Sequence, residues 1–315
     1  MIDPLTVLFG LGVGLLVGMT GIGGGSVMTP LLILVIGVKP VVAIGTDLLY
    51  AAITKTLGGW RHLRQGTVDL GISWWLASGS VPGALGGVWV LELVHDAYGD
   101  GFDTTVLLIV AAALLLTGAA TIGRAVFLPG MAERERDTLV LDRSHKLAAG
   151  AIGLSVGFVL GISSAGSGAL IAIGLIIVFR LTPRRVVGTD VFHAAILLWV
   201  ASLAHLVSGN VDLALTGNLL IGSLPGVWVG SNLSVRVPQS ALRPALGIVL
   251  VAAGLGILTK AGLGIPAPVL VGVPLALAVL TFLLARARRP ARDPEDVAME
   301  EGPVVAGTGL RGGEG

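Results

Sequence analysis

The sequence contains no cysteine and has few charged residues. Of its 315 residues, 12% are charged, whereas an average soluble domain has about 25%. The lack of cysteine excludes disulfides, thiolate catalysis and cysteine-ligated metal sites. A net charge of +1 provides no basic surface for nucleic acid, so we expect no nucleic-acid partner. So little charge cannot cover the surface of a soluble protein of this length, which excludes a soluble enzyme.

Apolar residues and glycine are abundant instead. Hydrophobic residues make up 54% of the chain, the mean hydropathy is +0.92, and 48 residues are glycine. Aromatic residues are scarce, at 5%, whereas a membrane β-barrel carries girdles of them. Glycine in contrast lets membrane helices approach closely. We therefore predict an all-α integral membrane protein.

The sequence contains nine long apolar runs. They cover 4–37, 41–60, 68–93, 104–128, 147–180, 186–207, 211–235, 243–260 and 264–285. About 20 residues suit one helical crossing of a bilayer, so the runs 4–37 and 147–180 are too long for one. Glycine and serine interrupt both, at 21–26 and 163–168. Because glycine costs about 1 kcal/mol in a helix interior, each cluster predicts a broken helix.

The chain is internally duplicated. A shift of 143 residues aligns 10–90 with 153–233 without a gap, and 29 of the 81 pairs are identical. The identical pairs include Pro40 with Pro183 and the Gly-Thr-Asp segments that end at Asp47 and Asp190. Two halves with glycine-interrupted segments at equivalent positions are typical of secondary transporters.

Basic residues predict how each half is oriented. Short cytoplasmic loops are enriched in Lys and Arg, and the connection 124–146 carries five such residues while the loop 94–103 carries none. If 147–180 is a re-entrant hairpin, the arginines at 180–185 are also cytoplasmic. The N-terminus is then outside and the C-terminus cytoplasmic. Plain crossings in a repeat of the same orientation remain the alternative.

The predicted organisation is two inverted repeats, each a re-entrant helical hairpin plus three transmembrane helices. The divisions are a first repeat at 1–128, a cytoplasmic linker at 129–146, a second repeat at 147–262, one extra C-terminal transmembrane helix at 263–286 and a disordered cytoplasmic tail at 287–315. An odd number of crossings in each half places the two halves in opposite orientations. The expected location is the cytoplasmic membrane, with the lipid bilayer as surroundings.

The hairpin tips are candidates for a binding site. A helix broken at mid-membrane exposes backbone N–H groups and a positive helix end, which attract an anion. The candidate substrate-binding residues there are Thr20, Gly23, Gly24, Gly25 and Ser26 in the first half and Ser163, Ser164, Gly166, Ser167 and Gly168 in the second. Close helix packing is the alternative explanation for the glycines.

The repeated Gly-Thr-Asp segment supplies further candidates. Asp47 and Asp190 lie seven residues beyond a proline, about 10 Å along a helix. A carboxylate at that depth is expensive and points to function, either proton coupling or a structural role as a helix cap or cation ligand. Thr46 and Thr189 are candidate uncharged donors to the substrate.

Three more side chains are possible charge partners in these segments. They are Tyr50, Lys55 and His193; for Lys55, a side chain that reaches the cytoplasmic interface is an equally good explanation. His62 and His205 near helix ends, and Asp69 and Asp212 at the next helix starts, are interpreted as structural. The five histidines show no zinc-binding spacing, so we expect neither a metal nor a cofactor.

Together these motifs resemble the sulfite exporter TauE/SafE family of membrane anion transporters. The resemblance covers about residues 5–260 and depends on the glycine-rich segment 14–25 with 30–32, the segment 43–47 and the segment 79–83. It implies transport of sulfite, sulfonates, thiosulfate or related anions. Family members often carry Ser after Gly-Thr, whereas both halves here carry Asp.

The predicted function is a secondary transporter of a small oxyanion or organosulfur anion, with protons as a coupling partner carried by Asp47 and Asp190. One alternative is a divalent cation transporter that uses the two aspartates as ligands. A remote alternative is an intramembrane serine hydrolase with Ser167 and either His193 or His205.

Overall fold

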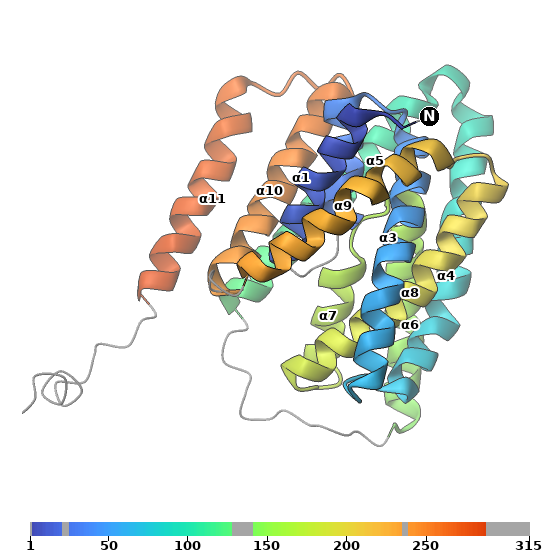
Figure 1. Cartoon of the computed structure of the whole chain (residues 1–315), viewed down its shortest axis with the longest axis vertical. Coiled ribbons are helices and arrows are strands. Elements are labelled where there is room, and N and C mark those ends of the chain that lie inside the picture. The colour runs from blue at the N-terminus through green and yellow to red at the C-terminus, as the bar shows by residue number, and fades with distance from the viewer. Residues whose placement is uncertain (1, 21–24, 128–140, 235–238, 288–315) are drawn as a thin grey trace, which may run out of the picture.

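The structure is a computed structural model that describes residues 2–20, 25–127, 141–234 and 239–287. Throughout these ranges the elements are helices (Figure 1). The all-α prediction is confirmed. The tips at 21–24, most of the linker and nearly the whole C-terminal tail lie outside the described residues.

The elements of the two halves follow one another in the same order. The first half contains α1 (Pro4–Thr20), α2 (Gly25–Leu31), the π-helix η1 (Leu32–Ile36), α3 (Pro40–Arg64), α4 (Leu70–Tyr98), the 3-10 helix η2 (Gly99–Gly101) and α5 (Phe102–Phe127). The second half contains α6 (Arg143–Ser163), α7 (Ser167–Ile177), α8 (Pro183–Val207), α9 (Leu213–Ser234) and α10 (Gln239–Lys260), and α11 (Ala267–Ala287) follows it.

Helix starts follow local sequence signals. Pro40 and Pro183 open α3 and α8, where a missing N–H costs nothing. Asp69 caps α4 by accepting from the backbone N–H of Ile72 at 3.0 Å. The predicted structural role of Asp69 as a helix start is confirmed. Asp142 caps α6 in the same way, so this helix begins four residues earlier than the predicted linker allowed.

Seven of the described helices are long and apolar enough to cross a bilayer. They are α3, α4, α5, α6, α8, α9 and α11. In α11 only 6% of the spanning window is buried against the rest of the protein, so its apolar side chains face the surroundings. An apolar helix with so little protein cover requires lipid.

The long run at 147–180 is broken where the sequence predicts it. α6 ends at Ser163, and the backbone of Ser164 and Gly166 is left-handed, with φ of 57° and 99°. α7 then runs back toward the end of the molecule where α6 began (Figure 1). In the first half, α1 ends at Thr20 and α2 begins at Gly25. Each half therefore contains a long helix, a break and a shorter helix.

Contacts between the halves occur in pairs related by the 143-residue shift. α1 packs along α9, and the equivalent α6 packs along α4. A Cβ atom on Gly14 would overlap the backbone of Ser223, and one on Gly157 would overlap the backbone of Ser80. Residue 157 corresponds to 14, and 223 to 80. Such reciprocal contacts are the pattern of a two-fold relation between two copies.

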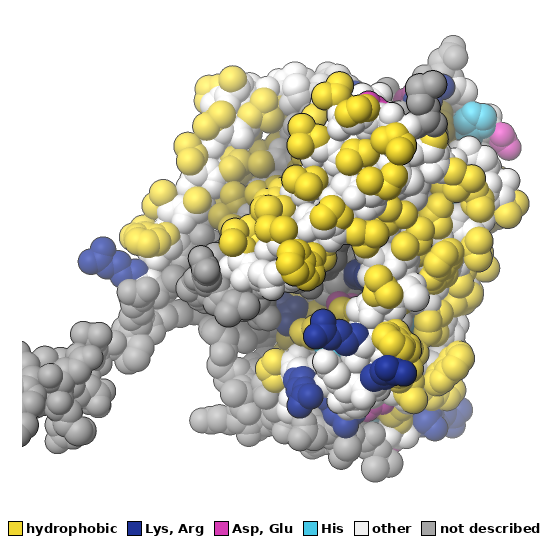
Figure 2. Space-filling view, in the orientation of Figure 1, with side chains coloured by type: hydrophobic (Ala, Val, Ile, Leu, Met, Phe, Trp, Pro, Cys, Tyr) yellow, Lys and Arg dark blue, Asp and Glu magenta, His cyan; other side chains and the backbone are white. Residues whose placement is uncertain are grey.

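Equivalent helices also run in opposite directions. The loop between α3 and α4 lies at the lower end of Figure 1, whereas the equivalent loop between α8 and α9 lies at the upper end. Lys and Arg side chains gather over the lower part of the visible face (Figure 2). These features support the prediction of inverted halves with one basic end.

Candidate functional site

Asp47 connects the two broken segments. It lies on α3, and its side chain has no exposed surface. Its Oδ2 atom accepts hydrogen bonds from the Thr29 backbone N–H at 3.2 Å, from the Thr29 hydroxyl at 2.5 Å and from the Ser164 hydroxyl at 2.9 Å. Thr29 belongs to α2 and Ser164 to the break between α6 and α7. One carboxyl oxygen therefore joins α2 to the break between α6 and α7.

The second oxygen of Asp47 is different. Oδ1 is buried and makes no hydrogen bond. Buried polar atoms without a partner are rare, because each pays the cost of leaving water without compensation. The carboxyl group thus has one crowded oxygen and one oxygen that can still hold a proton or a ligand.

Asp190 occupies the equivalent position on α8 in a different environment. Its residue is 9% exposed, and its Oδ1 also has no hydrogen-bond partner. In the alignment of the two halves, Ala172 corresponds to Thr29, and Gly21 corresponds to Ser164. Neither residue offers a hydroxyl, so the two aspartates are chemically unequal.

Lys55 lies within electrostatic range of both carboxyl groups. Its side chain is buried, with 7% exposure, and it interacts with Asp47 and Asp190. The sequence also allowed a Lys55 side chain that reaches the cytoplasmic interface, whereas the structure buries it. Arg124 is also within electrostatic range of Asp190. Cations of α3 and α5 therefore accompany the two acids.

Tyr50 and His193 lie at equivalent positions and each lies beside an equivalent serine. The Nε2 atom of His193 lies 2.9 Å from the Ser80 hydroxyl, while its Nδ1 has no partner. Tyr50 lies beside Ser223. These pairs join α8 to α4 and α3 to α9, which are contacts between elements of opposite halves.

The two predicted threonine donors lie in the contact between the halves. The hydroxyl of Thr46 accepts from the backbone N–H of Asp212 at 3.1 Å, and that of Thr189 accepts from Asp69 at 2.9 Å. Both threonines are fully buried. Each hydroxyl thus holds the cap residue of a helix in the other half, and donation to substrate stays a prediction.

The remaining predicted tip residues fall into two groups. Ser163 is buried, donates to the Val159 carbonyl at 2.6 Å and accepts from the Ala165 backbone N–H at 3.2 Å. Gly166 caps α7, and Gly168 lies in its first turn. Gly23 and Gly24 lie outside the described residues. The backbones of the remaining four are placed at helix ends: Thr20, Gly25, Ser26 and Ser167. The side chains of Thr20, Ser26 and Ser167 lie outside the description.

Thr29 and Ser80 are site residues that sequence reasoning missed. The Thr29 hydroxyl lies 2.5 Å from Oδ2 of Asp47, and the Ser80 hydroxyl lies 2.9 Å from Nε2 of His193. The available signal for Thr29 was a difference between the two halves, since this polar residue aligns with the apolar Ala172. For Ser80 the signal was its identity with Ser223 in a predicted transmembrane segment.

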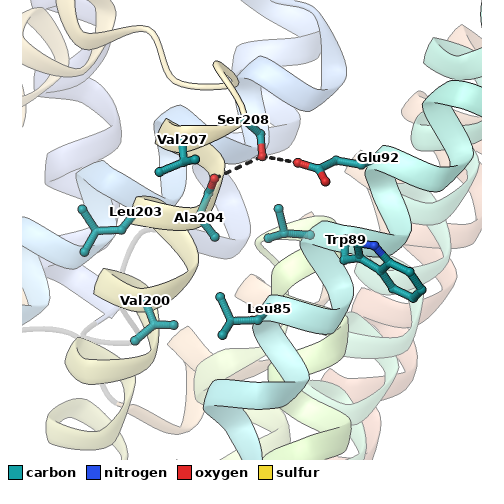
Figure 3. A pocket seen from close by; sticks show the side chains of 9 residues that line it. Leu85, Trp89, Glu92, Val200, Leu203, Ala204, Val207 and Ser208 are labelled. Carbon is teal, nitrogen blue, oxygen red and sulfur yellow. Dashed lines mark hydrogen bonds between the residues drawn. The ribbon is translucent and has the colours of Figure 1, made fainter.

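A cavity lies apart from these residues. It has a volume of about 480 Å³ and lies between α4 and α8 (Figure 3). Its lining is apolar except for Glu92 and Ser208, which are hydrogen-bonded at 2.5 Å. None of the predicted site residues lines it. This cavity is therefore separate from the aspartate site.

The two alternative chemistries gain no support from this geometry. Within the described ranges, no three His, Asp or Glu side chains gather as a metal ligand set. The Nε2 atoms of His193 and His205 already face Ser80 and the Gly161 carbonyl, each at 2.9 Å. Each histidine thus uses one ring nitrogen to join α8 to another helix, α4 for His193 and α6 for His205.

Comparison with known proteins gives a consistent result. A family model described as "Sulfite exporter TauE/SafE" matches residues 6–257. "Probable membrane transporter protein YjnA" of Bacillus subtilis (strain 168) is 37% identical over 252 residues, which cover 80% of this chain and 98% of that protein. "Probable membrane transporter protein YdhB" of the same organism is 27% identical over 250 residues, or 78% of this chain and 96% of that protein. No solved structure matches.

Proposed function

The chain belongs to the sulfite exporter TauE/SafE family of membrane transporters, and from this premise we propose that it moves a small oxyanion or organosulfur anion across the cytoplasmic membrane. Sulfite, a sulfonate and thiosulfate are the candidate substrates. The transport is secondary and coupled to protons. The two halves rock against each other around a site between the broken segments.

The observation that carries this proposal is the set of donors on Asp47. Two hydroxyls and one backbone N–H converge on a single buried oxygen. These donors come from α2 and from the break between α6 and α7, and they are the uncharged hydrogen-bond donors that an oxyanion needs. A position that satisfies a carboxyl oxygen can also satisfy an oxygen of sulfite or a sulfonate.

The coupling role falls to Asp47 and Asp190. Ionisable residues inside a membrane protein are costly and commonly form proton relays. Each aspartate keeps one buried oxygen without a hydrogen bond, which is the atom where a proton would be carried. Lys55, within range of both, would balance the charge that remains.

Uptake by proteoliposomes tests the proposal. Purified protein is reconstituted, and entry of ³⁵S-labelled sulfite or thiosulfate is followed with and without an imposed pH gradient. We expect Asp47→Asn and Asp190→Asn to lose gradient-driven accumulation by about tenfold or more, whereas exchange of labelled for unlabelled anion continues. The exposed Asp96→Asn is the matched control and should behave as wild type. Accumulation that is unchanged in both site variants would remove the proton coupling.

A ligand screen by thermal shift tests the substrate class separately. Stabilisation by sulfite, sulfate, thiosulfate, taurine or sulfoacetate is expected, and a divalent cation should have no comparable effect. Stabilisation by metals without any effect of anions would instead favour the cation transporter.

A further inference from the structure

We infer that Asp47 is a tethered competitor of the transported anion: its carboxylate occupies the donors of Thr29 and Ser164, and substrate binds there only after the carboxylate leaves them or loses its charge. This inference rests on the proposed function. It assigns Asp47 a role in substrate admission that differs from carrying a proton alone, because it states which groups the acid and the substrate share.

The first step is the direction of the hydrogen bonds. Thr29 presents its backbone N–H and hydroxyl to Asp47 Oδ2, and Ser164 adds a third donor from 135 residues further along the chain. An ionised carboxylate only accepts hydrogen bonds, as do the oxygens of sulfite and sulfonates. The carboxylate therefore satisfies the same three donors that would coordinate an incoming oxyanion.

The second step is charge. Lys55 interacts with both Asp47 and Asp190, so its single positive charge already faces two acids. The other charged or titratable groups around them are Tyr50 on α3, His193 on α8, which interacts with Lys55, and Arg124 on α5, which interacts with Asp190. An added anion next to an ionised Asp47 would place like charges side by side in a site that excludes water. Either the acid takes up a proton or the anion stays out.

The third step is the comparison between the halves. Asp190 has the same position in its repeat but meets Ala172 where Asp47 meets Thr29. The second carboxyl group therefore lacks the threonine donors. The competition is therefore confined to Asp47.

Anion affinity of the purified full-length chain tests the inference. Thiosulfate is titrated against wild type, Asp47→Ala and Asp96→Ala by isothermal calorimetry in detergent at neutral pH. Removal of the competitor frees the donors, so Asp47→Ala should bind thiosulfate about tenfold more tightly than wild type, whereas the exposed Asp96→Ala should stay within about threefold. The double variant Asp47→Ala with Thr29→Val should lose most of the gain, because the threonine hydroxyl is then missing.

Other results are equally decisive. If Asp47→Ala does not fold, the isosteric Asp47→Asn replaces it, with a gain of about threefold or more expected because the amide lacks the negative charge. Unchanged or weaker binding by a folded Asp47 variant, while wild type binds thiosulfate, would overturn the competition and leave the proposed function in place. If neither wild type nor any variant binds sulfite, thiosulfate or taurine, the proposed function fails, and the inference fails with it.

Discussion

At the scale of single residues, the site is held together by hydroxyl groups that donate hydrogen bonds to a buried carboxyl group. Thr29 has 1% of its surface exposed, and its short hydrogen bond to Asp47 lies wholly inside the protein. Loss of a partner in such a place leaves the other group without water or replacement. The stability of α2 against α3 therefore depends on this one contact more than on an average hydrogen bond.

Thr29→Val tests that dependence. Valine keeps the shape and β-branching but removes the hydroxyl donor, so the variant should be less stable by about 1–3 kcal/mol. The melting temperature in detergent measures the loss. Thr29→Ser keeps a hydroxyl and should recover most of it. Equal melting temperatures for the valine variant and wild type would contradict the contact.

A second residue-scale prediction concerns the cap of α6. Hydrogen bonds from the His145 backbone N–H and the Ser144 hydroxyl lower the pKa of Asp142 from 3.8 to about 2. Because the pKa is lower in the folded state, the stabilisation is complete above about pH 4 and is lost as the pH falls toward 2. The melting temperature of wild type should exceed that of Asp142→Ala at pH 7, and the difference should shrink below pH 4. Asp142→Asn, which keeps a capping oxygen but does not titrate, should show no such pH-dependent change of its own.

At the scale of elements, glycines set how closely the helices approach. A Cβ atom on Gly14 of α1 would overlap the backbone of Ser223 in α9, whereas one on Gly12 of the same helix would meet nothing within 4 Å. The two positions share a helix and differ only in what faces them. The spacing of α1 and α9 is thus fixed by the absence of side chains along one face.

Gly14→Ala and Gly12→Ala form a matched pair. The first should push α1 from α9 and destabilise the protein by about 1–3 kcal/mol, as overpacking does. The second should be neutral or stabilising by up to about 1 kcal/mol, because alanine favours the helix. Size-exclusion chromatography after heating measures both. A Gly12→Ala variant that is as unstable as Gly14→Ala would contradict this packing.

Element ends could be predicted from the sequence because their signals are local. Pro40, Pro183 and Asp69 each mark a helix start within a few residues of the chain. The partners of the site could not be predicted, because Ser164 meets Asp47 across 117 residues. Thr46 shows the same limit: its residue type suggested a donor, but the hydroxyl accepts from a helix start in the other half. Residue types at the site were foreseeable, whereas their pairing required the packing of the two halves.

At the scale of the whole molecule, the absence of cysteine makes the orientation directly measurable. Single cysteines can be introduced without removing any native thiol. Ser144→Cys and Arg184→Cys lie at the two ends of the α6–α7 segment, and we expect both to react with an impermeant maleimide only from the cytoplasmic side. Asp96→Cys, at the end of α4, should react only from outside. Labelling of residues 144 and 184 from opposite sides would show that the α6–α7 segment crosses the membrane and is not a re-entrant hairpin.

The reciprocal contacts have a consequence for how the protein moves. If each half can adopt the shape that its counterpart has now, exchange of the two shapes generates a second conformation open to the opposite side without any new kind of contact. The exchange is imperfect, because Thr29, Ser164 and Lys55 have no chemical counterparts at the matching positions. Under the proposed function, the two conformations would therefore differ in energy, and the empty carrier would rest with a preferred side open.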